Sequence, residues 1–382
     1  MKIVIAVDSF KGSLSSIEAG KAIEEGIRRV YLNSKVVVKP LADGGEGTVE
    51  ALIAGLNGKL RTIKVTGPLG EMVNCCYGII ESKTMAVIEM AQSSGLTLVP
   101  KSKRNPMYTT TYGLGQVIKD AINQGCRHFI IGIGGSATND GGIGMLQALG
   151  FELLDEDGKQ VDFGALGLKQ LKIIKTSKVL PVIKECDFMI ACDVNNPLCG
   201  PLGSSYVYGP QKGANKELIV QMDKWLNEYA ILSREICPLA NMDYPGAGAA
   251  GGLGFAFLTF LNAKLDSGIK LVLQEINFEE EVKDANLVIT GEGSLDFQTT
   301  MGKAPIGVAK LAKKYNLPVI AFAGSISNDA NICNNAGIDA YFSILRNIVT
   351  LPEAMNKERA KENITNTVEQ VFRLWKIRED HI

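Results

Sequence analysis

Short apolar runs that end in an acidic residue and a glycine- or serine-containing loop, each followed by an amphipathic stretch, recur along this chain. Residues 3–7, IVIAV, end at Asp8, and residues 36–42, VVVKPLA, end at Asp43. This strand–loop–helix order is typical of a parallel β-sheet covered by helices. The pattern therefore predicts an α/β fold.

Helix signals support this interpretation. Ser15 and Glu18 fit a capping box that opens a helix with one apolar face, formed by Ala19, Ile23, Ile27 and Val30. A second helix is predicted from about residue 112, with a stop at Gly125 and the apolar residues Leu114, Val117, Ile118, Ala121 and Ile122.

The repeated order is interrupted and later resumes, which indicates a second domain inserted into the first. Residues 61–91 contain short β-rich runs without a helix between them, so we expect antiparallel strands there. We predict a discontinuous parallel-sheet domain and an inserted α/β domain. The first would comprise 1–62, 108–150 and 285–382, and the second 63–107 and 151–284.

The composition excludes several classes of protein. Lys and Arg number 40 against 41 Asp and Glu, so we expect neither a nucleic-acid nor a membrane partner. The uncharged residues 244–263 are expected to be a glycine-rich loop that enters a buried helix. The 8 cysteines show no CxxC spacing and the N-terminal apolar run is short, so we expect a cytoplasmic protein. The sequence leaves open whether it is a monomer or a homodimer.

Acidic residues follow the predicted strands. Any one of them could cap a helix or close a turn, but together they favour one polar cleft at the carboxyl edge of a parallel sheet. Four come directly at strand ends and two lie in the following loops: Asp8, Asp43, Asp193 and Glu292, then Asp140 and Asp296.

Histidine is nearly absent from the chain. His128 precedes its predicted strand, away from the expected cleft, and His381 is the penultimate residue. A Ser-His-Asp or Cys-His mechanism therefore has no suitable base, and proton transfer would fall to a carboxylate or a lysine. A metal site would use oxygen ligands, which suits Mg²⁺ and not zinc.

Two glycine-rich loops match nucleotide-binding patterns only loosely. Residues 132–142, GIGGSATNDGG, follow a strand, but 138–142 separate the first glycines from the next helix. A dinucleotide site would also use an acid near 155–157. Residues 246–251, GAGAAG, are explained equally well by close backbone packing or by a phosphate loop. No P-loop motif occurs, so a phosphate would meet backbone N–H groups and a lysine: Lys11, the favoured candidate, Lys212 or Lys303.

Eight segments in order resemble the bacterial class I glycerate kinases: DSFKGSLS, PLADGGEGT, IEMAQSSGL, GGSATNDGGIGMLQALG, ACDVNNPLCGP, YGPQKGA, PGAGAAGGLG and TGEGSLDFQT. The resemblance runs from residue 1 to beyond 325. It implies ATP-dependent phosphorylation of D-glycerate to 2-phosphoglycerate with Mg²⁺, in a flavodoxin-like domain with a second α/β domain inserted. The family often has a basic residue where this chain has Ser294.

From this resemblance we hypothesise phosphoryl transfer in a cleft between the two domains. Lys11 would neutralise charge, and Asp43 or Asp193 would orient and deprotonate the acceptor hydroxyl. Glycerate would contact Asp8, Ser9, Ser13, Asn195 and Asn196. ATP would contact Gly134, Gly135, Ser136, Thr138, Asn139 and Lys303. Mg²⁺ would be held by Asp140, Glu292 and Asp296. An NAD-linked hydroxy-acid dehydrogenase and a non-catalytic nucleotide-binding protein are the alternatives.

Overall fold

The computed structural model describes residues 1–380 and divides into two compact units. The first unit is discontinuous, formed by residues 1–57 and 269–382, and the second unit is the continuous segment 58–268. His381 lies outside the described residues. Both units combine helices with parallel strands, so the predicted α/β class is confirmed.

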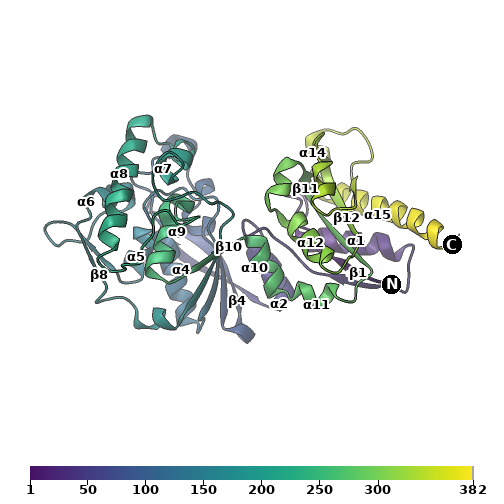
Figure 1. Cartoon of the computed structure of the whole chain (residues 1–382), viewed down its shortest axis with the longest axis horizontal. Coiled ribbons are helices and arrows are strands. Elements are labelled where there is room, and N and C mark those ends of the chain that lie inside the picture. Colours follow the sequence, from purple (N-terminus) through teal and green to yellow (C-terminus); the bar gives the residue numbers. More distant parts are fainter. Residues whose placement is uncertain (381–382) are drawn as a thin grey trace. The chain divides into compact units, whose positions relative to one another are not determined.

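The first unit is built on a five-stranded, entirely parallel sheet with the strand order β13-β12-β11-β1-β2. β1 and β11 lie side by side, purple and green in Figure 1, although the whole second unit separates them in sequence. The strands are β1 (Lys2–Ile5), β2 (Lys35–Val38), β11 (Leu287–Leu295), β12 (Val319–Ile326) and β13 (Ala340–Ser343).

Helix α1 (Ser16–Arg28) begins at the predicted capping box. The Ser15 N–H donates to Glu18 Oε2 at 3.1 Å, and the Glu18 N–H donates to Ser15 Oγ at 3.4 Å. The apolar face of α1 packs against the sheet and against α15 (Lys357–Asp380). Gly26 permits this contact, since a Cβ there would lie 2.5 Å from the Thr365 carbonyl oxygen.

The first unit also contains several shorter helices. They are α2 (Thr48–Leu56), α10 (Gly268–Glu275, of which Gly268 is the last residue of the second unit), α11 (Phe278–Val282), α12 (Ala304–Lys313), α13 (Ile332–Asn335) and α14 (Leu351–Ala354). A 3-10 helix, η6 (Phe297–Met301), connects β11 to α12 and lies where the candidate site is described below.

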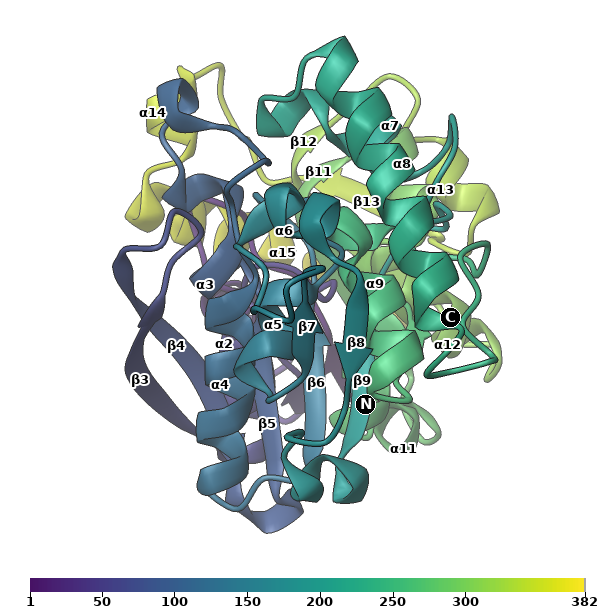
Figure 2. The same ribbon diagram turned by 90° about the vertical axis from the view of Figure 1, so that its left-hand side faces the viewer.

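The second unit contains a six-stranded mixed sheet with the order β10-β9-β6-β5-β4-β3 (Figure 2). β3 to β5 are antiparallel, as predicted for residues 61–91, and the remaining pairs are parallel. The strands are β3 (Lys59–Thr66), β4 (Met72–Ile80), β5 (Met85–Glu89), β6 (His128–Gly132), β9 (Asp187–Ala191) and β10 (Lys264–Asp266). A separate hairpin pairs β7 (Glu152–Leu154) with β8 (Ile173–Lys175).

The predicted domain boundaries differ from those of the two units in three places. Residues 58–62 lie in the second unit and residues 269–284 in the first, opposite to the prediction, and the third place is 108–150. Residues 108–150 were assigned to the first domain, but β6 is hydrogen-bonded between β5 and β9 in the sheet of the second unit. The strand–loop–helix signal is the same in both units because both contain parallel strands. The pattern therefore locates β6 and its helix correctly and does not identify the sheet to which they belong.

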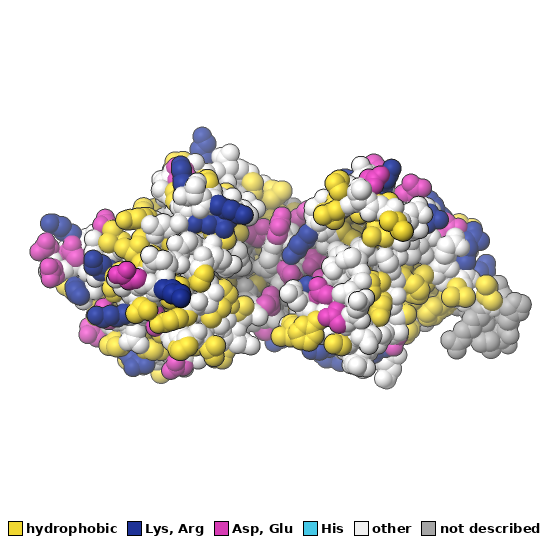
Figure 3. Space-filling view, turned by 90° about the horizontal axis from the view of Figure 1, so that it is seen from above, with side chains coloured by type: hydrophobic (Ala, Val, Ile, Leu, Met, Phe, Trp, Pro, Cys, Tyr) yellow, Lys and Arg dark blue, Asp and Glu magenta, His cyan; other side chains and the backbone are white. Residues whose placement is uncertain are grey.

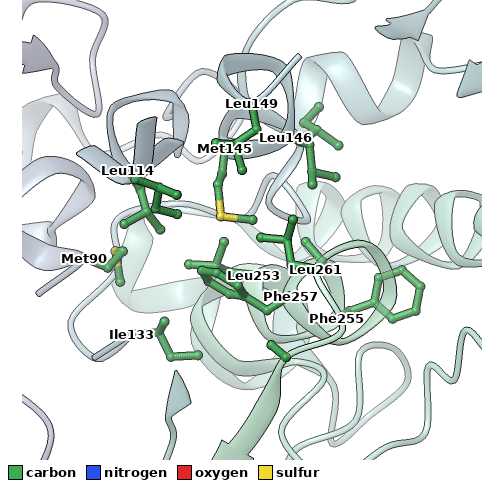
Figure 4. Packing of buried hydrophobic residues seen from close by; sticks show 14 of the residues in the cluster. Met90, Leu114, Ile133, Met145, Leu146, Leu149, Leu253, Phe255, Phe257 and Leu261 are labelled. Carbon is green, nitrogen blue, oxygen red and sulfur yellow. The ribbon is translucent and has the colours of Figure 1, made fainter. Parts of the chain in front are cut away.

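The core of the second unit forms where helices pack on this sheet. The helices are α3 (Ala91–Ser94), α4 (Tyr112–Asn123), α5 (Ile143–Ala148), α6 (Gly164–Gln170), α7 (Ser204–Tyr208), α8 (Lys216–Ser233) and α9 (Ala249–Phe260). Leu114 of α4, Met145 of α5 and Phe257 of α9 are fully buried in this core (Figure 4). The five predicted apolar residues of α4 are all buried.

The uncharged segment 244–263 is a loop that enters the buried helix α9, as expected from its sequence. In the described part of the chain, no helix combines the length and hydrophobicity needed to cross a bilayer. On the face shown in Figure 3, basic and acidic side chains are interspersed.

Candidate functional site

Four of the predicted acidic residues gather at the carboxyl edge of the first unit's sheet. Asp8 follows β1, Asp43 follows β2, and Asp296 follows β11. Glu292 lies within β11 and not at its end, because the strand continues to Leu295. We call Asp8, Asp43, Glu292 and Asp296, together with Lys11 and Lys303, the acidic edge.

Asp8 is the most buried carboxylate of the acidic edge, with 4% of its surface exposed. One of its oxygens accepts a hydrogen bond from the Ser9 N–H at 2.6 Å. Burial, and then the negative charge of Asp43, raise the pKa of Asp8 to about 7. A carboxyl group with such a pKa exchanges a proton near neutral pH, which is the property that general acid–base chemistry requires.

Lys11 and Asp43 form a loose ion pair beside Asp8, with 3.8 Å between Lys11 Nζ and Asp43 Oδ2. The Lys11 side chain is 60% exposed, and the loop that carries it turns at Gly12, whose φ of +78° favours glycine. The Oγ of Ser13 is buried and has no hydrogen-bond partner within residues 1–380. The loop therefore carries one exposed cation and one buried hydroxyl without a hydrogen-bond partner among the described residues.

A second lysine is shared by two carboxylates. Lys303 Nζ lies 3.7 Å from Glu292 Oε2 and 3.8 Å from Asp296 Oδ1. Thr299 Oγ1 donates to the other Glu292 oxygen at 2.6 Å, and Asp296 caps η6 through the Thr299 N–H. Burial raises the pKa of Glu292, and Thr299 and Lys303 oppose that shift.

The predicted glycine loop lies in the second unit, between β6 and α5. Gly134 and Gly135 are exposed, whereas the residues from Ser136 to Gly142 are buried. Within the described chain, the N–H groups of Gly134, Gly135 and Ser136 have no backbone acceptor. The start of the loop therefore offers free amide donors of the kind that bind anions.

Asp140 is buried and hydrogen-bonded within the protein. It is fully buried and accepts hydrogen bonds from the N–H and hydroxyl of Thr111 at 2.9 and 2.8 Å, from the Gly142 N–H at 3.1 Å, and from the Gly144 N–H. The carboxylate thereby caps α5 and holds the start of α4. Burial raises its pKa, and these donors oppose the shift. The oxygens needed for the predicted Mg²⁺ ligation are occupied by the protein itself.

Asn139 is also directed inward. Its Nδ2 donates to Ser205 Oγ at 3.0 Å, and its Oδ1 accepts from Ser204 Oγ at 3.3 Å, so the N-terminus of α7 fixes the loop. Thr138 is fully buried, and its Oγ1 has no partner among the described residues. Of the side chains predicted to contact ATP here, Ser136 lies nearest to the exposed glycines, and it is 6% exposed.

Residues 246–252 comprise the loop before α9 and the start of α9, where 250–252 are not helical, and they pack directly on the glycine loop. The Gly141 N–H donates to the Gly251 carbonyl at 2.9 Å, and a Cβ on Gly251 would lie 2.1 Å from the Thr138 carbonyl oxygen. Ala250, Gly251 and Gly252 all have positive φ. Of the two explanations left open for GAGAAG, this geometry supports backbone packing.

Lys212 is buried, which its sequence surroundings did not indicate. It is 2% exposed, and its Nζ donates to Ser136 Oγ at 2.8 Å and to the Thr138 carbonyl at 2.6 Å. Burial lowers the pKa of Lys212 to about 7, and the nearby charge of Asp140 opposes the shift. The motif YGPQKGA was the available signal, but an isolated lysine in a loop usually lies in solvent.

Asp193 and Asn195 follow β9 and are exposed, while Asn196 is half-buried. Asp193 Oδ1 accepts from the Gly268 N–H at 3.2 Å. Asn196 is fixed on both sides, because its Nδ2 donates to the Leu202 carbonyl at 2.8 Å and its Oδ1 accepts from the Tyr208 hydroxyl at 2.6 Å. Asp193, Asp140 and the asparagines belong to the second unit, whereas the acidic edge belongs to the first.

The donor set of the acidic edge suits a hard cation. No group of three or more His, Cys, Asp or Glu side chains in residues 1–380 is arranged to hold a metal ion by itself. Mg²⁺ is commonly bound by one or two carboxylates together with substrate phosphates and water. Glu292 and Asp296, which both lie within 4 Å of Lys303 Nζ, would supply the two carboxylates of such a site, with oxygen atoms as the only protein ligands.

The topology after the glycine loop differs from that of a dinucleotide-binding unit. Such a unit needs a second parallel strand after the helix, with an acid at its end. Here α5 is followed by β7, which pairs antiparallel with β8 in a separate hairpin. Of the acids at 155–157 considered for that role, Asp155 instead accepts hydrogen bonds from the Asp157 and Lys159 N–H groups in the turn after β7.

Comparison with known proteins gives one consistent family. The model of the glycerate kinase family matches residues 3–376. A glycerate kinase of Halalkalibacterium halodurans is 51% identical over 95% of this chain and 97% of its own length, and a glycerate 2-kinase of Escherichia coli K12 is 50% identical over 96% and 98%. A crystal structure assigned to glycerate kinase 2 of Salmonella typhimurium LT2 superposes with a TM-score of 0.92 and 46% identity, covering 100% of this chain and 99% of that one. The chain is therefore a phosphotransferase and belongs to the glycerate kinase family.

Proposed function

We propose that this enzyme transfers the terminal phosphoryl group of ATP to the 2-hydroxyl of D-glycerate, with Mg²⁺, and releases 2-phosphoglycerate and ADP. The acidic edge is the observation that carries the proposal. It combines four carboxylates and two lysines at the carboxyl edge of a parallel sheet, where ligands of such sheets bind. Phosphoryl transfer depends on positioning and charge neutralisation, and this set supplies both.

Asp8 is our proposed proton acceptor for the glycerate hydroxyl, a role first considered for Asp43 or Asp193. Its pKa of about 7 makes it a better acceptor than an ordinary carboxylate at neutral pH. Asp43 orients the hydroxyl, and Lys11, 3.8 Å from Asp43, neutralises the glycerate carboxylate or the phosphoryl group in transit. The Ser9 and Ser13 hydroxyls complete the contacts to glycerate.

The nucleotide phosphates are assigned to the glycine loop and to Lys303. The free N–H groups of Gly134, Gly135 and Ser136 support this assignment, since backbone amides without acceptors attract anions. Thr138 and Asn139 are buried and act by shaping the loop. Asp193, Asn195 and Asn196 remain proposed substrate contacts, Asn196 through its backbone because its side chain is occupied.

Glu292 and Asp296 are the proposed Mg²⁺ ligands. Asp140 is not among them, because its oxygens accept hydrogen bonds from Thr111 and Gly142. The ion would neutralise charge on the phosphate oxygens. Lys303 lies within 4 Å of both carboxylates, and it would keep them in place before the ion binds.

The experiment is an ADP-release assay with D-glycerate, L-glycerate and no acceptor, in the presence of Mg²⁺ or EDTA. We expect ADP release only with D-glycerate and Mg²⁺, and a product that matches authentic 2-phosphoglycerate and not 3-phosphoglycerate by phosphorus NMR. ATP, but not NADH, should raise the melting temperature. ADP release that ignores glycerate, or a 3-phosphoglycerate product, would contradict the proposal.

A further inference from the structure

The buried Lys212 is the strongest feature that the proposed mechanism leaves unused. It lies at the end of the 3-10 helix η5 (Pro210–Lys212), which connects α7 to α8 in the second unit (Figure 2). Gly213 follows it with a φ of +97°, and a Cβ there would lie 2.2 Å from the Arg104 carbonyl oxygen. This tight turn directs the Lys212 side chain into the protein.

Stability alone does not explain a cation at this position. No ion pair joins Lys212 to a carboxylate in the described part of the chain, and its Nζ contacts the neutral oxygens of Ser136 and Thr138. The negative charge of Asp140 attracts Lys212 without a direct contact, and the Asp140 carboxylate already accepts hydrogen bonds from Thr111 and Gly142. A buried charge without a direct counter-ion destabilises a folded protein.

Both contacts of Lys212 fall on the glycine loop, immediately after its exposed part. Ser136 Oγ and the Thr138 carbonyl flank Ala137, and the free amides of Gly134 and Gly135 directly precede them. The lysine therefore holds the buried part of the loop, next to the residues that are exposed to solvent. A positive charge behind the loop also favours an anion in front of it.

We propose that Lys212 is a positioning residue that holds residues 134–138 in the shape that binds the phosphates of a nucleotide. This inference depends on the proposed function, because it takes the glycine loop as the nucleotide site. Lys212 acts through Ser136 and Thr138 and does not itself contact the substrate. The occupant is a di- or triphosphate anion, which supplies the negative charge that the buried ammonium lacks.

The test is a double-mutant cycle on ADP affinity, with Lys212→Met, Ser136→Ala and the double variant. Met approximates the length of the side chain without its charge. The control is Lys216→Met, which removes an exposed lysine at the start of α8. Each variant is measured for its ADP dissociation constant by calorimetry, its KM for ATP and for glycerate, and its melting temperature without ligand.

We expect Lys212→Met to weaken ADP binding and raise the KM for ATP roughly tenfold or more, the effect of a lost charge-assisted contact. The KM for glycerate should change less than about twofold, and Ser136→Ala should cause a smaller loss. The double variant should bind ADP no more weakly than Lys212→Met alone, since both substitutions break the same contact between Lys212 and Ser136.

Three results would overturn the inference: a folded Lys212→Met variant that binds ADP like the wild type, losses that add in the double variant, or a raised KM for glycerate alone. If Lys212→Met does not fold, an unchanged ADP affinity in Ser136→Ala would also overturn the inference. A wild-type chain that binds no ADP would instead refute the proposed nucleotide site, and this inference with it.

Discussion

The two units use buried carboxylates in opposite ways. In the first unit, burial opposes the ionisation of Asp8 most, and the negative charges of Asp43 and, to a smaller extent, Glu292 add to that effect. In the second unit, Asp140 is more deeply buried, but its hydrogen-bond partners are donors of its own loop and of Thr111. A carboxylate surrounded by like charge is poised to gain a proton or a cation, whereas a carboxylate surrounded by donors holds the fold together.

Replacing Asp8 by Asn should produce the largest effect on activity. The amide removes the proton acceptor and one negative charge, so we expect kcat to fall by about 10²–10⁴-fold. The fold should survive, because the side-chain carbonyl oxygen of the variant can still accept the Ser9 N–H. Steady-state ADP release and thermal unfolding measure the two quantities. Asp157→Asn, in the exposed hairpin turn, is the control, and turnover within tenfold of the wild type in Asp8→Asn would remove Asp8 from the mechanism.

The same substitution at Asp140 should have its main effect on stability. The new amide group would direct two N–H donors at Thr111 or at the Gly142 and Gly144 N–H groups, leaving buried donors without acceptors. We expect the free energy of unfolding to fall by about 3 kcal/mol. Urea denaturation measures it. A variant as stable as the wild type that has lost its Mg²⁺ dependence would restore Asp140 as a metal ligand and end the contrast with Asp8.

These two residues also show how far the sequence could be interpreted. Asp8 comes directly after an apolar strand and Asp140 in the loop after another, and both adjoin glycine, serine or asparagine, so the local sequence does not distinguish their roles. Thr111 donates hydrogen bonds to Asp140, whereas Asp8 lies near the negative charges of Asp43 and Glu292. These partners are distant in the chain from the carboxylates they affect. The class of fold and the location of the loops follow from local periodicity, whereas the partner of each carboxylate depends on tertiary packing.

Lys212 makes the same point for a cation. Lys11 was favoured over it because Lys11 lies in a strand–helix turn, and the structure places Lys11 next to Asp43. No local pattern around YGPQKGA reveals that the Lys212 side chain is buried, because its partners Ser136 and Thr138 lie about 75 positions earlier. Likewise β6 could be predicted as a strand, but its membership of the second sheet depends on pairing with β5 and β9.

Glu292→Gln tests whether the acidic edge binds the metal ion. The amide oxygen can still accept the Thr299 hydroxyl, so we expect little change in stability. The Mg²⁺ concentration that gives half-maximal rate should rise by on the order of tenfold, at a fixed ATP concentration. The rate is measured against free Mg²⁺ for this variant and for Asp157→Asn. An unchanged Mg²⁺ requirement would mean that Glu292 serves only to hold Lys303 and Thr299.

The last prediction is a difference in how the two units respond to pH. The pKa of Asp8 is raised from 3.8 to about 7, so its contribution to stability is complete below pH 3.8 and is lost as pH rises through 7. The pKa of Lys212 is lowered from 10.5 to about 7, so its contribution is complete above pH 10.5 and is lost as pH falls through 7. Acid should therefore favour the folded first unit, and mild alkali the folded second unit.

Each slope is limited to about 1.4 kcal/mol per pH unit for one titrating group. The free energy of unfolding of Asp8→Asn, minus that of the wild type, should rise between about pH 4 and 7 and change little above it. For Lys212→Met the same difference should fall between about pH 7 and 10.5. Urea denaturation at each pH provides both curves, with Lys216→Met and Asp157→Asn as references. Parallel curves for a variant and the wild type would show that the group ionises as it does in the unfolded chain, and the contrast between the two units would then rest on hydrogen bonds alone.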